Sequence, residues 1–263
     1  MSVTAKVAKY EVRDVFRSRW LLGYAMFLVL VTDALLRFGG AGERALLSLV
    51  NIVLFVVPLV TIVFATVYLY NAREFTELLL AQPLRRRQLF GGLFAGLAVP
   101  LSLALVAGIV LPVVMHAADN PVDRGTLVVL LGTGVALTVV FTAIAFLIVA
   151  RSDDRMKGLG VAIALWLMFA VLYDGLVLLL VSILADYPLE RPLLGLMAAN
   201  PVDLARVVLL LRFDVSALLG YTGAVMRQFF GGSAGTAITA TALALWAVIP
   251  AVLGMRAFER KDF

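Results

Sequence analysis

Six long apolar segments, separated by shorter connections, constrain this chain more than any other feature of its sequence. They cover about residues 21–38, 45–70, 90–115, 126–150, 158–184 and 236–258. A run of about 18 or more predominantly apolar residues is long enough to cross the hydrocarbon core of a membrane as a helix. Backbone groups in lipid must be hydrogen-bonded within the segment, which favours helices. The sequence therefore predicts an all-α integral membrane protein with six transmembrane helices.

The composition leaves no room for a separate soluble domain. Mean hydropathy is +1.04, and 63% of the 263 residues are apolar while 15% are charged. Soluble domains are far less apolar. We therefore expect a single transmembrane domain over residues 1–263. Cysteine is absent, so the chain has no disulfide framework, no thiolate metal site and no cysteine nucleophile.

Positive charge is distributed unevenly between the two sides of the six-span pattern. Fifteen of the 22 Lys and Arg residues fall on one side: Lys6, Lys9, Arg13, Arg17, Arg19, Arg73, Arg85, Arg86, Arg87, Arg151, Arg155, Lys157, Arg256, Arg260 and Lys261. Short cytoplasmic loops hold the excess of Lys and Arg, so this side and both termini are predicted to be cytoplasmic. Contact with anionic membrane lipid explains the net charge of +5, and we expect no nucleic-acid partner.

Two further parts of the chain are predicted to be helical without crossing the membrane. Residues 1–20 alternate basic and apolar positions, which predicts an amphipathic helix at the cytoplasmic interface that carries Arg13 and Arg17. Residues 185–234 are largely apolar and contain no uncharged run long enough to span. We expect them to form short re-entrant outer helices at about 200–211 and 215–230, since Asn200 and Pro201 form a helix-start signal.

The cytoplasmic segment 71–89 carries the most functional information. Its first part predicts a short helix with acidic residues in the first turn, which the helix dipole favours, and Pro83 ends it. A short charged helix between two long spans could act as a lever for a cytosolic partner. The alternative is that its arginines only set the topology and that the helix is a solvated loop.

A pattern in this segment resembles the coupling segment of type-2 ABC exporter permeases. The pattern is E-x-x-x-x-L-L-x-x-P-x-x-R-x-x-L, from Glu74 to Leu89. The resemblance implies that the segment docks into an ATP-hydrolysing partner subunit, with two partner copies serving a homodimer of this chain. ATP hydrolysis would then drive either export or mechanical signalling across the membrane. ATP and Mg would then be bound by the partner, and this chain would need no cofactor. The residues implied in ATPase coupling are Glu74, Phe75, Glu77, Leu78, Pro83 and Arg86, with Arg13 and Arg17 as support from the interface helix.

Three further patterns resemble one branch of that family, the NosY-type permeases of nitrous-oxide-reductase maturation. They are K-x-E-V-R-D-x-F-R-S-R-W from Lys9, W-L-M-F-A-V-L-Y-D from Trp166, and A-N-P-V-D-L-A-R from Ala199. The likeness covers nearly the whole chain. It implies a bacterial inner-membrane protein, a role in the maturation of a copper enzyme and a periplasmic partner protein. Arg73, before Glu74, departs from the more acidic family pattern.

Catalytic motifs give weaker alternatives. Gly91 and Gly96 have the spacing of a P-loop, but Leu97 stands where the lysine must be, so the chain cannot bind ATP in that way. The run 231–235 matches G-x-S-x-G, and His116 is the only histidine, so an intramembrane serine protease is one alternative. A membrane scaffold for enzyme maturation, without an ATPase, is another. We expect neither catalytic residues nor a metal site in this chain.

Two carboxylates lie inside predicted spans, where each needs a partner or a cavity. Asp33 has Arg37 one turn later, a spacing that allows an ion pair along the helix. Asp174 has no charged neighbour within one turn, so its partner must come from another element, and Arg206 and Arg212 are the candidates. We expect Asp174 to hold the fifth span to the outer helices in a contact that changes during the working cycle.

Glycine is concentrated at the start of the third span. Gly91, Gly92 and Gly96 give it a face of small side chains. Such faces allow close packing of a neighbouring helix.

Overall fold

The computed structural model describes residues 3–40, 42–80, 85–183, 195–212 and 233–260, and these form helices joined by short turns. Six helical stretches in this part of the chain are long and apolar enough to cross a membrane. They are α2 (Arg19–Phe38), α3 (Gly42–Asn71), α5 (Arg86–Met115), α6 (Arg124–Arg151), the fifth stretch Arg155–Leu180, and the main part of α12 (Ser233–Arg260). The predicted six-span fold is confirmed, and the boundaries agree to within a few residues.

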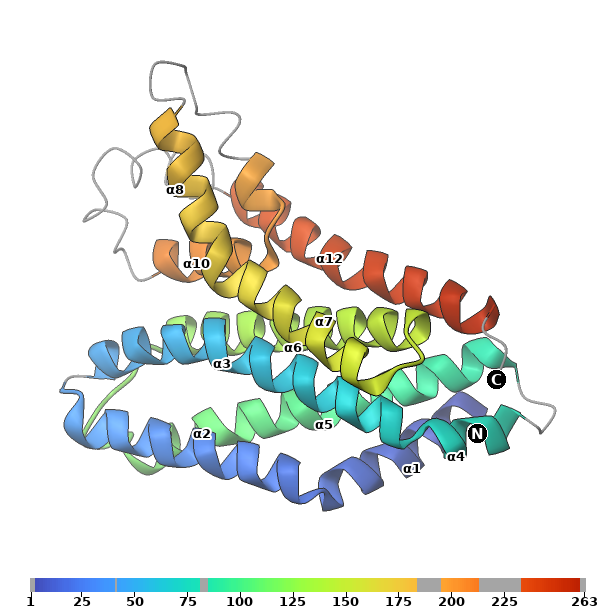
Figure 1. Ribbon diagram of the computed structural model, residues 1–263. Coiled ribbons are helices and arrows are strands. Elements are labelled where there is room, and N and C mark those ends of the chain that lie inside the picture. The colour runs from blue at the N-terminus through green and yellow to red at the C-terminus, as the bar shows by residue number, and fades with distance from the viewer. Residues whose placement is uncertain (1–2, 41, 81–84, 184–194, 213–232, 261–263) are drawn as a thin grey trace.

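The spans run side by side with α3, α5 and α6 in the middle of the bundle (Figure 1). About half of the apolar window is buried in each of these three helices, but only 11% of the fifth span. Fully buried side chains such as Leu49, Leu97, Leu105 and Phe141 form the core between them. The outer faces of the remaining spans carry exposed leucine, isoleucine and valine side chains, as expected for surfaces that meet lipid.

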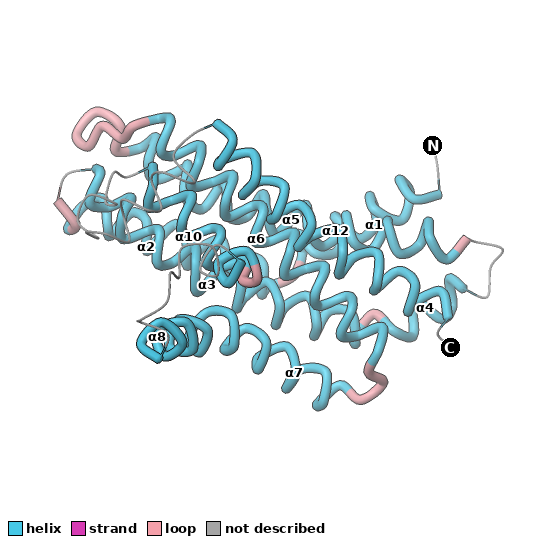
Figure 2. The backbone as a smooth tube through the Cα atoms, turned by 90° about the horizontal axis from the view of Figure 1, so that it is seen from above, coloured by secondary structure: helices cyan, strands magenta, loops and turns pink. Residues whose placement is uncertain are grey.

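The fifth span is interrupted by a short π-helix. It consists of α7 (Arg155–Leu167), the π-helix η1 (Met168–Leu172) and α8 (Tyr173–Ile183). Figure 2 shows α7 and α8 at the edge of the bundle. π-Helical turns are rare and occur frequently at functional sites, because the widened turn leaves backbone carbonyls that other groups must satisfy. Periodicity in the sequence did not predict this interruption.

Two shorter helices lie at the end of the bundle where α12 ends, α1 (Val3–Arg17) and α4 (Arg73–Leu80) (Figure 1). The chain bends between α1 and α2 at Ser18, whose backbone is extended. The predicted amphipathic helix is present, and its apolar face packs on the first turns of α5. A Cβ atom on Gly92 would lie 2.7 Å from Val7 Cγ1, and one on Gly96 would collide with Glu11 Cβ. The glycine face of the third span therefore receives α1.

Helix α10 (Pro201–Arg212) forms within the predicted outer region and packs against α6, α12 and α3. Its buried face comprises Pro201, Val202, Asp203, Leu204, Ala205, Val207 and Leu209. The Asn200 side chain accepts a hydrogen bond from the Val202 amide at 2.9 Å, which is the predicted cap. The second predicted outer helix, at 215–230, lies outside the described residues.

Candidate functional site

Helix α4 follows α3 after a single residue and presents one face outward. Glu74 is exposed and Leu78 is 69% exposed. Because they are four residues apart, they lie one above the other on the same helix face. Thr76, on the opposite side, is buried, and its hydroxyl donates to the Ala72 carbonyl at 2.9 Å. Of the predicted coupling residues that the structure describes, Glu74 and Leu78 are therefore the ones most open to a partner.

The other predicted coupling residues of α4 make contacts within the chain. The Phe75 ring stacks on Tyr10 of α1, with centroids 5.4 Å apart. Glu77 forms an ion pair with Arg73 at 3.0 Å, and Arg73 also lies 3.3 Å from Asp153 in the turn between α6 and α7. These contacts connect α4 to two other elements at the same end of the bundle. Pro83 lies outside the described residues.

Arginines at the start of α5 hold the end of α12. Arg86 Nη1 donates to the Glu259 carbonyl at 2.8 Å, and Arg87 Nε meets the Glu259 carboxylate at 2.6 Å. The last carbonyls of a helix lack partners within the helix and carry partial negative charge, so a guanidinium stabilises them. The sequence singled out Arg86 for the coupling segment but gave no sign of this contact, which joins residues far apart in the chain.

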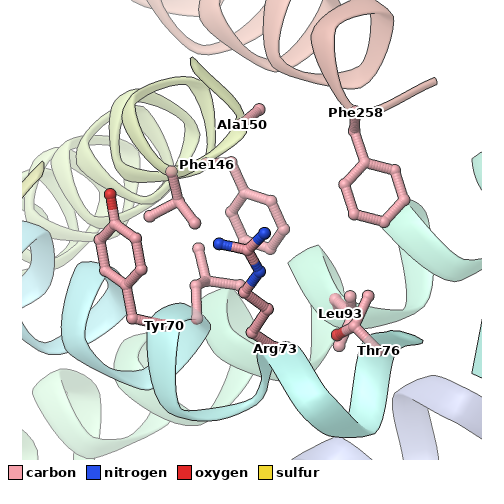
Figure 3. A pocket seen from close by; sticks show the side chains of 9 residues that line it. Tyr70, Arg73, Thr76, Leu93, Phe146, Ala150 and Phe258 are labelled. Carbon is pink, nitrogen blue, oxygen red and sulfur yellow. The ribbon is translucent and has the colours of Figure 1, made fainter. Parts of the chain in front are cut away.

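A small cavity of about 40 Å³ lies where α4 meets the spans. Its walls come from α3, α4, α5, α6 and α12, and Figure 3 shows the Arg73 guanidinium directed into it. The lining residues are Leu69, Tyr70, Arg73, Thr76, Leu93, Phe146, Val149, Ala150 and Phe258. The Tyr70 hydroxyl donates to the Ser152 carbonyl at 3.0 Å. Helix α4 therefore faces four of the six spans across this cavity.

Helix α1 contacts α3 through two carboxylates and one hydroxyl. The Tyr68 hydroxyl lies 2.5 Å from Glu11 Oε2 and 2.9 Å from Asp14 Oδ2. A hydroxyl has one hydrogen to donate, and the Tyr68 hydroxyl can direct it to either carboxylate. Glu11 is 1% exposed, and burial raises its pKa above 4.5. Arg13 and Arg17 are exposed on the opposite face.

The raised pKa of Glu11 predicts a pH-dependent stability. The folded protein binds this proton more tightly than the unfolded chain, so the stabilisation is complete below pH 4.5 and is lost as the pH rises through the folded-state pKa. We expect Glu11→Gln to reduce this loss, since an amide keeps the contact without ionising. Thermal midpoints in detergent at several pH values would measure it. Glu43→Gln, on an exposed carboxyl of α3, is the control, and identical pH profiles for Glu11→Gln and wild type would contradict this expectation.

At the opposite end of the bundle, Asp33 has two cationic or potentially cationic partners. Arg37 Nε lies 2.9 Å from Asp33 Oδ2, which is the predicted pair within α2. His116, at the end of α5, lies 2.7 Å from Asp33 Oδ1. Nearby, the Asn120 side chain donates to the Leu36 carbonyl at 3.0 Å. His116 thus joins α5 to α2. Its role in the protease alternative gains no support from this contact, and Gly231 and Gly232 of that motif lie outside the described residues.

Asp174 meets Arg206, one of the two partners considered from sequence. Arg206 Nη1 lies 2.8 and 2.7 Å from the two Asp174 oxygens and 3.1 Å from Asp203 Oδ1. Burial raises the pKa of Asp203 to about 6, an effect that the Arg206 charge opposes. Asp174, Arg206 and Asp203, called here the outer ion cluster, join α8 to α10. Arg212, the other candidate, lies 3.5 Å from Asp123 instead.

Two hydrogen bonds next to the outer ion cluster satisfy the irregular backbone of this region. Asn200 Nδ2 donates to the Phe169 carbonyl in η1 at 2.8 Å, and the Tyr173 hydroxyl donates to the Leu196 carbonyl at 2.7 Å. The π-helix and the start of α10 are therefore held together by side chains that lie within two of the sequence patterns noted above. The fifth span and α10 form one connected unit.

Comparisons with known proteins agree with this architecture. Residues 5–263 match the model of the ABC-2 family transporter proteins. The chain is 29% identical to the probable ABC transporter permease protein NosY of Pseudomonas aeruginosa, with 99% of each chain covered. It is 26% identical to the probable ABC transporter permease protein NosY of Stutzerimonas stutzeri, with 97% of this chain and 95% of the relative covered. The resemblance seen in the sequence is thereby confirmed, and the protein belongs to the ABC-2 transporter family as a multi-pass permease subunit of the NosY type.

Proposed function

We propose that this permease receives ATP-driven movement from a separate ATPase subunit through α4 and passes it to the membrane spans. The observation that supports this most directly is the division of α4 into two faces. Glu74 and Leu78 face outward, whereas Phe75 and Arg73 contact α1 and the turn after α6. A short helix that is open on one side and attached on the other can transmit force without unfolding. ATP and Mg are bound by the partner in this proposal.

The assembly we propose is a homodimer of this chain with two copies of the ATPase. Its orientation follows the positive charge, which places both termini and α4 in the cytoplasm of a bacterial cell and the spans in the inner membrane. Exposed apolar side chains cover most of the fifth span, which leaves a surface that a second copy or lipid can cover. A maturation role for a copper enzyme such as nitrous oxide reductase, with a periplasmic partner, rests on the NosY likeness.

The coupling proposal predicts a specific effect of charge at Glu74. We expect Glu74→Arg to weaken association with the ATPase about tenfold. Reversing the charge of a side chain at a docking site replaces attraction to the partner with repulsion, which costs roughly 1.4 kcal/mol or more. The test is co-expression with a candidate ATP-binding subunit encoded nearby, followed by measurement of complex yield in detergent and of ATP hydrolysis.

The matched control is Glu43→Arg, which reverses the charge of another exposed carboxylate, in the first turn of α3 at the other end of the bundle. A complex that loses ATP hydrolysis with Glu74→Arg and keeps it with Glu43→Arg supports the proposal. A permease that purifies alone and binds no ATPase subunit would overturn it and favour the scaffold alternative.

A further inference from the structure

An apolar groove runs along the surface between α6, α10 and α12, well away from α4. The cavity has a volume of about 440 Å³, which is within the range of small-molecule sites. It is lined by Val129, Gly132, Thr133, Ala136 and Val139 of α6, Val208 of α10, and Ala240, Leu243, Ala244 and Ala247 of α12. These three helices are neighbours in the bundle (Figure 1). Most of these side chains are small, so the groove results from the residue types that line it and does not require the helices to be loosely packed.

A hydrogen bond fixes the α12 wall of the groove relative to the start of α10. Trp246 Nε1 in α12 donates to the Ala198 carbonyl just before α10, at 3.0 Å. The buried face of α10 meanwhile packs against α6, with Leu204, Ala205 and Leu209 almost fully buried. Helix α10 is therefore fixed to α12 by the hydrogen bond and to α6 by packing, so the groove between the three helices has a defined shape.

The length and position of the groove match one leaflet of a bilayer. The residues of α6 that line it run from Val129 to Val139, which is about 15 Å of helix. That is half of a hydrocarbon core of about 30 Å. Because α6 begins at Arg124, the groove occupies the half of the membrane away from α4. An acyl chain of a lipid in that leaflet has the right direction and depth to lie in it.

A guanidinium stands at the mouth of the groove. Arg212 follows the lining residue Val208 by one turn of α10, and its Nη2 atom lies directly against Gly125, one turn before the lining residue Val129. A Cβ atom at Gly125 would collide with this guanidinium, so the Arg212 side chain can adopt this position only because residue 125 is glycine. Within the described residues, the ion-pair partner of Arg212 is Asp123 at 3.5 Å, and the Arg212 side chain is 48% exposed. Its other N–H groups are available to a phosphate.

We propose that the groove binds one phospholipid of the leaflet on this side, with an acyl chain along α6 and the phosphate at Arg212. The combination of an apolar channel of leaflet depth with a guanidinium at its headgroup end carries the assignment. The site is independent of the proposed ATPase coupling, since it shares no residue with α4, α1 or the cavity behind them. It provides a means for membrane lipid to stabilise the contact between α10 and α12.

The test uses the lipid-stripped protein in detergent and phosphatidylglycerol as the probe, with bound lipid counted by native mass spectrometry. Gly132→Leu should abolish the tightest bound lipid, because a Cβ atom at Gly132 meets no other atom within 4 Å and the added side chain fills the groove. Ala244→Leu fills it from α12 and should have the same effect. Arg212→Gln should weaken phosphatidylglycerol about tenfold and leave diacylglycerol of the same chains unaffected.

The controls place equivalent changes elsewhere. Gly23→Leu adds the same side chain to an open position on α2, and Arg44→Gln removes an exposed arginine at the same end of the bundle. Both should bind lipid as the wild type does. Equal lipid retention by Gly132→Leu and Gly23→Leu would overturn the proposal. So would a shift from dimer to monomer in Gly132→Leu with unchanged lipid binding, because a second copy would then occupy the groove.

Discussion

Replacing Arg206 with methionine is expected to lower the free energy of unfolding by about 3 kcal/mol, the lower end of the range for removing one partner of a buried ion pair. Methionine keeps much of the apolar volume and removes the charge. Asp174 and Asp203 then face each other without a cation, and the Asp203 side chain is only 12% exposed. The lower end of the range applies because the Asp174 side chain is 40% exposed, so water screens part of the loss.

A denaturant titration of the protein in detergent would measure this loss in the free energy of unfolding. Arg44→Met, which removes an exposed arginine of α3, is the matched control and should change stability by less than about 0.5 kcal/mol. Adding Asp174→Asn and Asp203→Asn to Arg206→Met should restore most of the stability, because no unpaired charge is left. If Arg206→Met is as stable as Arg44→Met, the outer ion cluster does not hold α8 to α10.

A functional consequence accompanies the structural one. We proposed from sequence that Asp174 holds the fifth span to the outer helices through a contact that changes during the cycle. The pair with Arg206 and the adjoining π-helix, whose Phe169 carbonyl is bound by Asn200, give this idea a structural basis. Asp174→Asn should therefore alter ATP-coupled activity, and unchanged stability together with unchanged activity would contradict it.

The spans and the Asp174–Arg206 pair were predictable because both follow from solvation. The length of an apolar run is enough to identify a span. A carboxylate within a span needs a cationic partner, and the sequence offered only Arg206 and Arg212 as candidates for Asp174. The partnership of His116 with Asp33 was not predictable, because Arg37 already satisfied the local requirement and the two segments are far apart in sequence. The π-helix leaves no trace in composition.

The face of α4 that is open to a partner could not be read from the sequence either. Glu74, Phe75, Glu77 and Leu78 lie on neighbouring positions of one side of the helix, and the coupling resemblance covers all of them. Only the position of Tyr10 and Asp153 shows that Phe75 and Arg73 turn toward the rest of the chain. These partners come from the first helix and from the turn after α6, so local spacing carries no information about them. The coupling roles themselves stay predictions.

Replacing Gly96 with leucine is expected to cost about 3 kcal/mol and to separate α1 from α5. Overpacking a close contact typically costs about 1–3 kcal/mol, and here the obstacle is rigid, because a Cβ atom at Gly96 collides with Glu11 Cβ next to the α1 backbone. The helix itself must move. The backbone is extended at Ser18, between α1 and α2, so α1 can shift as a helix separate from α2.

Limited trypsin digestion would detect this separation, because Lys6, Lys9, Arg13 and Arg17 lie in α1. We expect faster cleavage there in Gly96→Leu and unchanged cleavage in Gly23→Leu, whose added side chain meets open space. Gly92→Ala and Gly91→Ala form a finer pair, since a Cβ atom lies 2.7 Å from Val7 at Gly92 but 3.5 Å from Thr4 at Gly91. Equal cleavage in all four variants would show that the glycine face is not what holds α1.

Loss of α1 would also reach α4. Tyr10 would leave Phe75, so that of the two contacts described for α4 only the one between Arg73 and Asp153 would remain. Glu11 would at the same time leave Tyr68 of α3. Gly96→Leu is therefore expected to reduce ATPase coupling while leaving the exposed Glu74 and Leu78 chemically unchanged. A variant that still binds the ATPase but no longer responds to it would separate docking from transmission. Equal coupling in Gly96→Leu and Gly23→Leu would mean that α4 works without α1.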